Sequence, residues 1–378
     1  MKIAILGTRG IPNHYGGFEQ ATEQLSVGLA AKGHDVSVYN SHNHPCQEKT
    51  WKGVHLIHCY DPEFKIGTAG QFVYDLLCIL DARKRNFDLI LFMGYTSSSI
   101  WHLFFPGNTI IVSNMDGMEW QRSKYSKPVR RFLKKAERLA VQHSHFHIVD
   151  STEMRNYLQR EYGLACEYIP YGASLSREEK EGILNAYGLK PGEYFLLMAR
   201  MEPENNVDTV LEGFNESTSG RKFMIIGNMK TSYGRSIWTK YRHDSRIIFA
   251  GPLFDQDVVD TLRKHASIYF HGHSVGGTNP SLLEAMASKT LIAAHGNKFN
   301  QAILKNNAYY FRDANEVKEL IEAPNGKDDS CWIENNYLQV QEHFNWQNVI
   351  DQYDQFLVYC YKKQRGIQIA ATPGYVYE

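Results

Sequence analysis

The chain has 378 residues, 43% of them hydrophobic, which is enough for two globular domains with substantial cores. Its 41 basic and 41 acidic residues balance, so no global field would attract nucleic acid, and no nucleic-acid partner is expected. No run approaches the roughly 18 apolar residues of a membrane span, and the opening segment is too short for a signal peptide. The six cysteines lack C-x-x-C and metal-ligand spacing, so free thiols and a cytoplasmic location are expected.

The first half of the chain alternates short apolar runs with helical patterns. Buried strands are predicted at residues 2–6, 36–39, 89–92, 110–112 and 147–149. Helices are predicted between them at residues 18–31, 71–84 and 128–143. Such alternation is typical of a parallel sheet with right-handed crossovers.

The same pattern restarts after Gly172. Strands are predicted at residues 194–198, 223–226, 247–249, 268–271 and 291–294, with helices starting near 206, 255 and 280. A long amphipathic helix is predicted at 345–361. We therefore expect an α/β chain of two Rossmann-like domains, residues 1–172 and 173–345, facing a central cleft. Residues 346–362 would return to the N-terminal domain, and 363–378 would form a tail. Ligands bind at the carboxyl ends of such strands.

The most informative segment follows the predicted strand at 268–271. Gly277, Thr278 and Asn279 form a loop before a helix that Pro280 opens, and Glu284 lies one turn inside it. Glycine permits close approach of a ligand, and the free N–H groups of a helix start attract an anion. A diphosphate with an attached ribose fits this layout, with Glu284 accepting hydroxyl hydrogen bonds. The alternative is an ordinary strand-to-helix turn with a surface Glu.

A second candidate follows the strand at 194–198. Arg200 offers a planar fork that matches phosphate oxygens, although it could also be a surface residue paired with Glu202 or Glu204. Asn205 can add a hydrogen bond but no charge, and it also suits a helix N-cap.

Together these segments resemble the donor-binding signature of GT-B glycosyltransferases of the large retaining family four. Further resemblance lies in Gly16-Gly17-Phe18-Glu19, in Gly33-His34-Asp35-Val36 and in the crossing Tyr168-Ile169-Pro170-Tyr171-Gly172. Two positions depart from the family pattern: Gly276 replaces its first Glu, and Asn205 replaces its phosphate-binding Lys. The segments 7–12 and 114–120 resemble a bacterial subgroup that adds rhamnose or a similar sugar during capsule or O-antigen synthesis.

The resemblance implies a nucleotide diphosphate sugar as the donor substrate and no cofactor or metal. Donor-binding candidates are Gly16, Gly17, Arg200, Asn205, Gly277, Thr278, Asn279, Ser281 and Glu284. Candidate catalytic residues are Asp116 and Arg200. Asp116, Glu119 and His14 are candidates for the acceptor side. Plain turns are the alternatives for Gly16, Gly17 and Asp116, and structural roles are the alternative for His14, His271 and His273.

A basic segment stands out from the neutral background. It contains Arg122, Lys124, Lys127, Arg130, Arg131, Lys134, Lys135 and Arg138. It overlaps a helix with an apolar opposite face, which is typical of a membrane-surface element. We predict that Arg130, Arg131, Lys134 and Lys135 contact an anionic membrane beside a lipid-linked saccharide acceptor. A solvated charged helix is the alternative.

The sequence thus predicts a retaining glycosyltransferase, peripheral at the inner face of the cell membrane. A non-catalytic nucleotide-sugar binding protein is the first alternative, motivated by Gly276 and Asn205. A nicotinamide-dependent oxidoreductase is the second, although Gly7-Thr8-Arg9-Gly10 has the wrong spacing for a dinucleotide fingerprint.

Overall fold

The N-terminal domain is built on an eight-stranded sheet in the order β3-β4-β2-β1-β5-β6-β7-β8. The computed structural model describes residues 1–115, 117–122, 125–175, 179–275, 277–323 and 329–368. All neighbouring strands in this sheet are parallel except β3 and β4. The strands are β1 (Lys2–Leu6), β2 (Asp35–Ser41), β3 (Thr50–Trp51), β4 (Val54–Cys59), β5 (Leu89–Phe92), β6 (Ile110–Asn114), β7 (Phe146–Val149) and β8 (Glu167–Tyr168).

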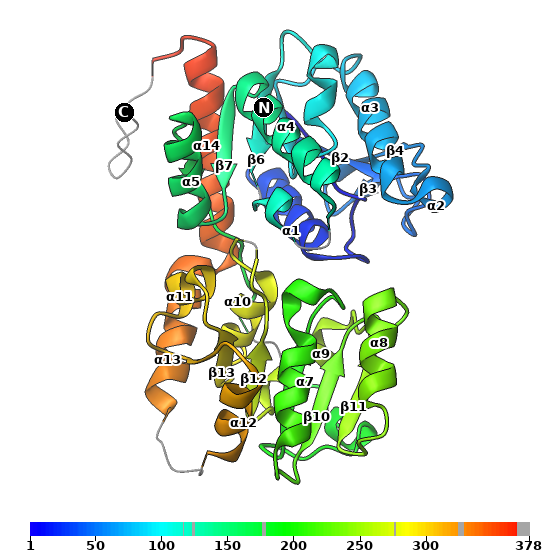
Figure 1. Cartoon of the computed structure of the whole chain (residues 1–378). Coiled ribbons are helices and arrows are strands. Elements are labelled where there is room, and N and C mark those ends of the chain that lie inside the picture. Colours follow the sequence, from blue (N-terminus) through cyan, green and yellow to red (C-terminus); the bar gives the residue numbers. More distant parts are fainter. Residues whose placement is uncertain (116, 123–124, 176–178, 276, 324–328, 369–378) are drawn as a thin grey trace.

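Helices connect these strands and cover the sheet (Figure 1). They are α1 (Gly17–Ala31), α2 (Glu63–Ile66), α3 (Gly70–Ala82), α4 (Lys127–His143) and α5 (Thr152–Tyr162). Short 3-10 turns are η1 (Gly67–Ala69), η2 (Ser99–Phe104) and η3 (Glu119–Gln121). The apolar faces of β1, β2 and β5 are almost fully buried, because helices pack on both sides of a parallel sheet.

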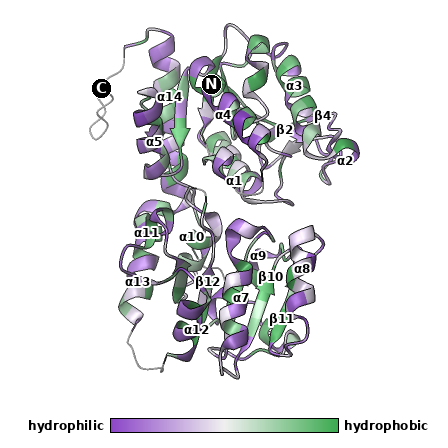
Figure 2. Ribbon diagram, viewed as in Figure 1, coloured by the Kyte–Doolittle hydropathy of each residue, from purple (hydrophilic) through white to green (hydrophobic). Residues whose placement is uncertain are grey.

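The C-terminal domain has a six-stranded parallel sheet in the order β11-β10-β9-β12-β13-β14. Its strands are β9 (Tyr194–Met198), β10 (Lys222–Ile226), β11 (Ile247–Gly251), β12 (Ile268–His271), β13 (Ile292–His295) and β14 (Tyr309–Phe311). Strands β10 and β11 are hydrophobic throughout much of their length (Figure 2). The chain builds outward from β9 to β11 and then returns to place β12 on the other side of β9. The topological switch point, where such sheets bind ligands, therefore lies between the carboxyl ends of β9 and β12.

The C-terminal domain carries helices on both faces of its sheet. They are α6 (Ile183–Ala186), η4 (Pro203–Asn205), α7 (Val207–Glu216), α8 (Ser232–Tyr241), α9 (Gln256–Lys264), α10 (Pro280–Ala287), α11 (Lys298–Leu304), α12 (Ala314–Glu322), α13 (Ser330–Gln339) and the π-helical turn η5 (Val340–Phe344).

The last helix, α14 (Trp346–Gln364), leaves the C-terminal domain and packs on the N-terminal domain beside α1 (Figure 1). Lys32, which follows α1, binds Asp351 of α14 at 2.7 Å, and His34 binds Asp354 at 2.7 Å. Gly28 faces Ile350 so closely that an added Cβ would lie 2.5 Å from it. The predicted fold, with two facing parallel-sheet domains and a returning helix, is confirmed.

Four strands lie outside the sequence prediction: β3, β4, β8 and β14. Three of them have only two or three residues, so they carry no readable apolar run. The fourth, β4, places His55 on an exposed face between buried Val54 and Leu56, so its composition does not resemble a central strand. No helix in the described part of the chain is long and apolar enough to cross a membrane.

Candidate active site

The start of α10 is capped by its own side chains. Asn279 is the N-cap, and its Oδ1 accepts hydrogen bonds from the Ser281 N–H at 3.0 Å and from the Ser281 hydroxyl at 2.9 Å. Pro280 occupies the first turn, where its missing N–H costs nothing. Asn279 and Ser281 were predicted as donor ligands, but their side chains already serve this cap.

The loop before α10, residues 277–279 (the donor loop), lies against the N-terminal domain. Thr278 is buried, and its hydroxyl donates to the carbonyl of Asp150 at 2.5 Å. Asp150 directly follows β7. A Cβ added at Gly277 would lie 2.0 Å from Oδ1 of Asp150, so only glycine fits there. The glycine of the loop thus serves a close domain contact in this structure.

The glycines before α1 also face the start of α10. Gly16 is the N-cap of α1, and a Cβ at Gly17 would lie 3.3 Å from Cγ of Pro280. One turn further along α1, the Gln20 amide donates to Oε1 of Glu284 at 2.9 Å. The structure therefore brings together the two glycine segments that the sequence singled out separately.

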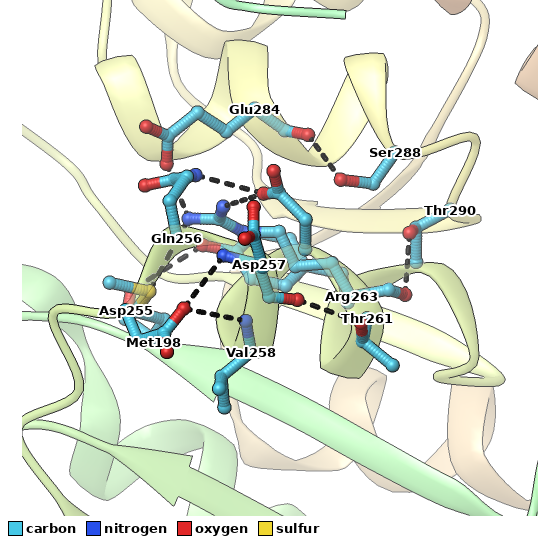
Figure 3. Close-up of polar contacts among 12 residues, drawn as sticks. Met198, Asp255, Gln256, Asp257, Val258, Thr261, Arg263, Glu284, Ser288 and Thr290 are labelled. Atoms are coloured by element: carbon cyan, nitrogen blue, oxygen red, sulfur yellow. Dashed lines mark hydrogen bonds and ion pairs between the residues drawn. The ribbon is translucent and has the colours of Figure 1, made fainter. Parts of the chain in front are cut away.

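Glu284 is buried rather than solvated, which excludes the predicted alternative of a surface Glu. Its Oε2 accepts a 2.5 Å hydrogen bond from Arg263, a fully buried residue of α9 (Figure 3). Arg263 also pairs with Asp260 at 3.1 Å. The carboxylate of Glu284 is thus held between a guanidinium and the Gln20 amide, and its role toward a ribose stays a prediction.

Arg200 lies just after β9, and its side chain is exposed. The predicted alternative paired it with Glu202 or Glu204. In the structure both carboxylates face Arg122 of the N-terminal domain instead, at 3.8 and 3.6 Å. The Asn205 side chain donates to the carbonyl of Arg200 at 2.7 Å.

The N-cap alternative for Asn205 needs correction, whereas its role as a donor ligand stays a prediction. Asn205 is buried and ends η4, where its amide helps to hold the turn after β9. It is also not the N-cap of α7, because Asn206 takes that place with a left-handed backbone, φ 50°. The Asn206 amide binds the carbonyl of Gly272 at 2.7 Å, which ties the loop after β9 to the loop after β12.

Two histidines lie at the end of β12: His271 is its last residue and is buried, and His273 is half-buried. The rings of His271 and His273 stack with centroids 4.4 Å apart. Burial, helped by the nearby guanidinium groups of Arg200 and Arg122, lowers the pKa of His273 to about 3. Burial likewise lowers the pKa of His271. Both rings are therefore neutral near pH 7, and a neutral imidazole can both give and accept a hydrogen bond.

The acceptor-side candidates are only partly placed. Asp116 and Gly276 lie outside the described residues. Glu119 opens η3 and binds Arg122 at 2.5 Å, so it faces the cleft side of its domain. His14 is exposed, and its ring meets that of His44 edge-on at 4.4 Å.

A cavity lies behind the donor loop. It has a volume of about 580 Å³ and is lined by residues of both domains and of α14, among them Gly277, Thr278, Phe299 and Asn348. At the switch point itself the domains are in contact through Gly17, Gln20 and Thr278.

The prediction that Arg130, Arg131, Lys134 and Lys135 contact a membrane needs one correction. Lys134 does not point outward: its ammonium group binds Glu137 at 3.0 Å and contacts the hydroxyl of Tyr157. Burial opposes the charge, yet hydrogen bonds to Tyr157 and Glu137 raise the pKa of Lys134. Arg130 is half-buried, whereas Arg131 and Lys135 are exposed.

Four residues that shape the site carry no local sequence signal: Gln20, Arg122, Asp150 and Arg263. Arg122 was included only as part of the basic segment. Arg263 looks like an ordinary cation in the last turn of an amphipathic helix, a position that normally faces solvent. Only a burial pattern that places it opposite Glu284 reveals its role.

Comparison with known proteins supports the assignment of the chain. Residues 179–325 match the family of glycosyl transferases group 1, and residues 1–174 match a domain of unknown function, DUF1972. A comparison with curated protein sequences finds no match.

Solved structures share the fold at low sequence identity. Sucrose-phosphate synthase from Thermosynechococcus elongatus is 18% identical, with a TM-score of 0.77 over 96% of this chain and 99% of that one. Anabaena HepE in complex with UDP-glucose is 14% identical, with a TM-score of 0.75 over 95% of this chain and 100% of that one. AviGT4, a glycosyltransferase of avilamycin A biosynthesis, is 15% identical, with a TM-score of 0.59 over 96% of this chain and 97% of that one.

These matches favour a glycosyltransferase over the two alternatives, a non-catalytic binding protein and a nicotinamide-dependent oxidoreductase. The C-terminal domain matches the glycosyl transferases group 1 over residues 179–325, and the protein is a glycosyltransferase with the GT-B fold.

Proposed function

We propose that the protein transfers a sugar, with rhamnose as the first candidate, from a nucleotide diphosphate sugar to a lipid-linked or saccharide acceptor in surface polysaccharide synthesis. The observation that carries the proposal is the composition of the switch point between β9 and β12. There Arg200 follows one strand, and the donor loop and the start of α10 follow the other. A guanidinium and the positive end of a helix are groups that stabilise a diphosphate.

The same groups suit the chemistry of sugar transfer. As the glycosidic bond breaks, negative charge grows on the departing diphosphate, so Arg200 and the positive end of α10 stabilise the transition state more than the ground state. We propose transfer with retention by a front-face route, in which the leaving phosphate takes the acceptor proton. Asp116 remains the candidate for orienting the acceptor hydroxyl or the transferred sugar.

A nucleotide-sugar donor also agrees with one of the structural relatives. HepE has been solved with UDP, with UDP-glucose, and with UDP and glucose. That protein is similar to this chain in fold, so it supports the class of donor and not the particular nucleotide or sugar.

A direct test begins with thermal shift of the purified protein against UDP-, GDP- and dTDP-sugars, followed by turnover with the donor that binds. Arg200→Ala should weaken binding of the matching nucleoside diphosphate by about 1.5–3 kcal/mol, the range for a hydrogen bond to a charged group. Arg235→Ala, which removes an exposed Arg of α8 in the same domain, is the matched control. Equal affinity in wild type and Arg200→Ala would remove Arg200 from the donor site. The anomeric configuration of the product, read by NMR, tests retention.

We also propose that transfer needs no divalent metal, because Arg200 and backbone N–H groups supply the charge that a metal would otherwise bring. Turnover in excess EDTA should therefore equal turnover in magnesium. Loss of activity in EDTA, restored by magnesium or manganese, would contradict this proposal.

A further inference from the structure

A cation of the N-terminal domain reaches the switch point of the C-terminal domain. Arg122 follows η3, and its guanidinium lies 3.6 Å from Glu204 and 3.8 Å from Glu202. Both carboxylates belong to the turn that begins after β9. The Arg122 side chain is only 13% exposed, so this contact lies inside the domain interface and not on its rim.

The turn that receives Arg122 is joined to the loop after β12. The carbonyl of Glu204 accepts hydrogen bonds from the Ser274 N–H at 3.0 Å and from the Ser274 hydroxyl at 2.8 Å. Arg122 is therefore placed where the loops of the two central strands meet.

The carboxylates that face Arg122 differ in how closely they approach it and in how well they are paired. Its pair with Glu119, in its own domain, is tight at 2.5 Å. Its two pairs across the interface lie beyond hydrogen-bond distance. Glu204 is 6% exposed, and among the described residues neither of its carboxylate oxygens accepts a hydrogen bond. A buried carboxylate in that state is costly and binds its partner less well than a phosphate in bidentate contact would.

We propose that Arg122 is a ligand of the donor diphosphate, supplied by the acceptor-side domain and held in place by Glu202 and Glu204 until the diphosphate replaces them. The proposal rests on the nucleotide-sugar function proposed above. Under this proposal the diphosphate site has both of its cationic side chains only when the two domains are together, because Arg200 comes from one domain and Arg122 from the other.

The competing explanation is a latch, in which Arg122 acts only by holding the domains closed through Glu202 and Glu204. The two explanations differ in what Arg122 recognises. A phosphate ligand discriminates a nucleoside diphosphate from the nucleoside that lacks phosphates. A latch changes the affinity of both equally, because both bind the same closed form.

The experiment measures calorimetric affinity for the tightest binder among UDP, GDP and dTDP and for its nucleoside. Arg122→Gln should weaken the diphosphate about tenfold to a hundredfold and leave the nucleoside unchanged. Arg131→Gln removes the same charge from an exposed position of α4 and should change neither. Equal weakening of diphosphate and nucleoside, or no weakening of either, would overturn the proposal.

A second variant distinguishes the two explanations, a phosphate ligand and a latch, even if Arg122→Gln folds poorly. Glu204→Gln removes one competitor for the guanidinium, so diphosphate affinity should stay the same or rise. A fall in diphosphate affinity, with thermal unfolding unchanged, would show that the ion pair itself matters and would overturn the proposal. If the wild type binds none of the three diphosphates, the proposed function itself fails. If the wild type binds a diphosphate and the Arg122→Gln variant binds it equally well, only the role of Arg122 fails.

Discussion

Buried charged pairs decide how single residues of the site behave. Arg263 is fully buried and depends on Glu284 and Asp260 for compensation. Removing one partner of such a pair leaves a buried charge that neither water nor protein satisfies, which typically costs about 3–5 kcal/mol. Glu284 therefore contributes to the stability of the domain, whatever it does for a ligand.

Glu284→Gln should lower the free energy of unfolding by about 3 kcal/mol, toward the lower end of that range because Asp260 remains. Urea unfolding measures it. Glu334→Gln is the matched control, since its pair with Lys289 at 2.9 Å is exposed and should contribute less than about 1 kcal/mol. If Glu284→Gln unfolds like the wild type but loses nucleotide affinity, the carboxylate serves the ribose and not Arg263.

A second buried carboxylate, that of Asp75, makes the stability of the protein depend on pH. Asp75 of α3 is 2% exposed and accepts a 2.6 Å hydrogen bond from the Ser97 hydroxyl, and burial raises its pKa to about 7. Folding therefore favours the protonated acid. Its contribution to stability is complete below the unfolded pKa, near 4, and declines as pH rises toward 7.

Asp75→Asn should remove this decline. The difference in free energy of unfolding between the variant and the wild type should shift in favour of the variant by on the order of 2–4 kcal/mol from pH 4 to pH 8, since one pKa unit corresponds to about 1.4 kcal/mol. The comparison of the two pH values cancels any constant cost of the amide. Parallel stability curves for wild type and Asp75→Asn across this range would show that Asp75 is already ionised in the folded protein.

At the scale of elements, the sequence predicted central strands well and interfaces poorly. Strands β1, β5, β9 and β12 lie where apolar runs placed them, because a strand buried on both faces must be apolar throughout. The start of α10 was likewise readable from Pro280. The contact between Gln20 and Glu284 was not, because it joins residues 264 positions apart through the packing of two domains. Periodicity within one element carries no information about such a partner.

The close approach of the donor loop to β7 can be tested with Gly277→Ala. The added Cβ would meet the Asp150 carboxylate, so the loop must move away from the N-terminal domain and transfer should slow by more than tenfold. Each domain should keep its own fold, because the clash lies between them. Gly296→Ala is the control, since its Cβ would have ordinary contacts at 3.6 Å or more.

A smaller partner should relieve this clash. Turnover of Gly277→Ala with Asp150→Ser should exceed that of Gly277→Ala alone. If Gly277→Ala transfers at the wild-type rate, the contact with Asp150 does not persist during turnover.

At the scale of the whole molecule, the structure redefines which cations of α4 can reach a membrane. Lys127, Arg131, Lys135 and Arg138 are exposed, whereas Lys134 is bound to Glu137. Apolar groups accompany them: Phe132 is 39% exposed, and Leu103 of η2, which packs on α4, is 81% exposed. Hydrophilic and hydrophobic residues follow one another along the ribbon of α4 (Figure 2), as expected of an amphipathic helix.

We therefore predict that replacing the four exposed cations of α4 with Gln reduces co-sedimentation with anionic vesicles, because each basic residue near such a surface contributes about 1 kcal/mol. Added salt should weaken the wild-type contact, since screening acts within about 8 Å at physiological ionic strength. The matched control replaces four exposed cations of the C-terminal domain, Lys190, Lys230, Arg242 and Lys305. Lys134→Gln alone should not change co-sedimentation, because its ammonium group is already paired within the protein.

The α4 variant should also slow transfer to a lipid-linked acceptor more than to a short soluble analogue. Equal sedimentation of the α4 variant, the control and the wild type would mean that α4 is a solvated face and that the acceptor reaches the cleft without a membrane contact there.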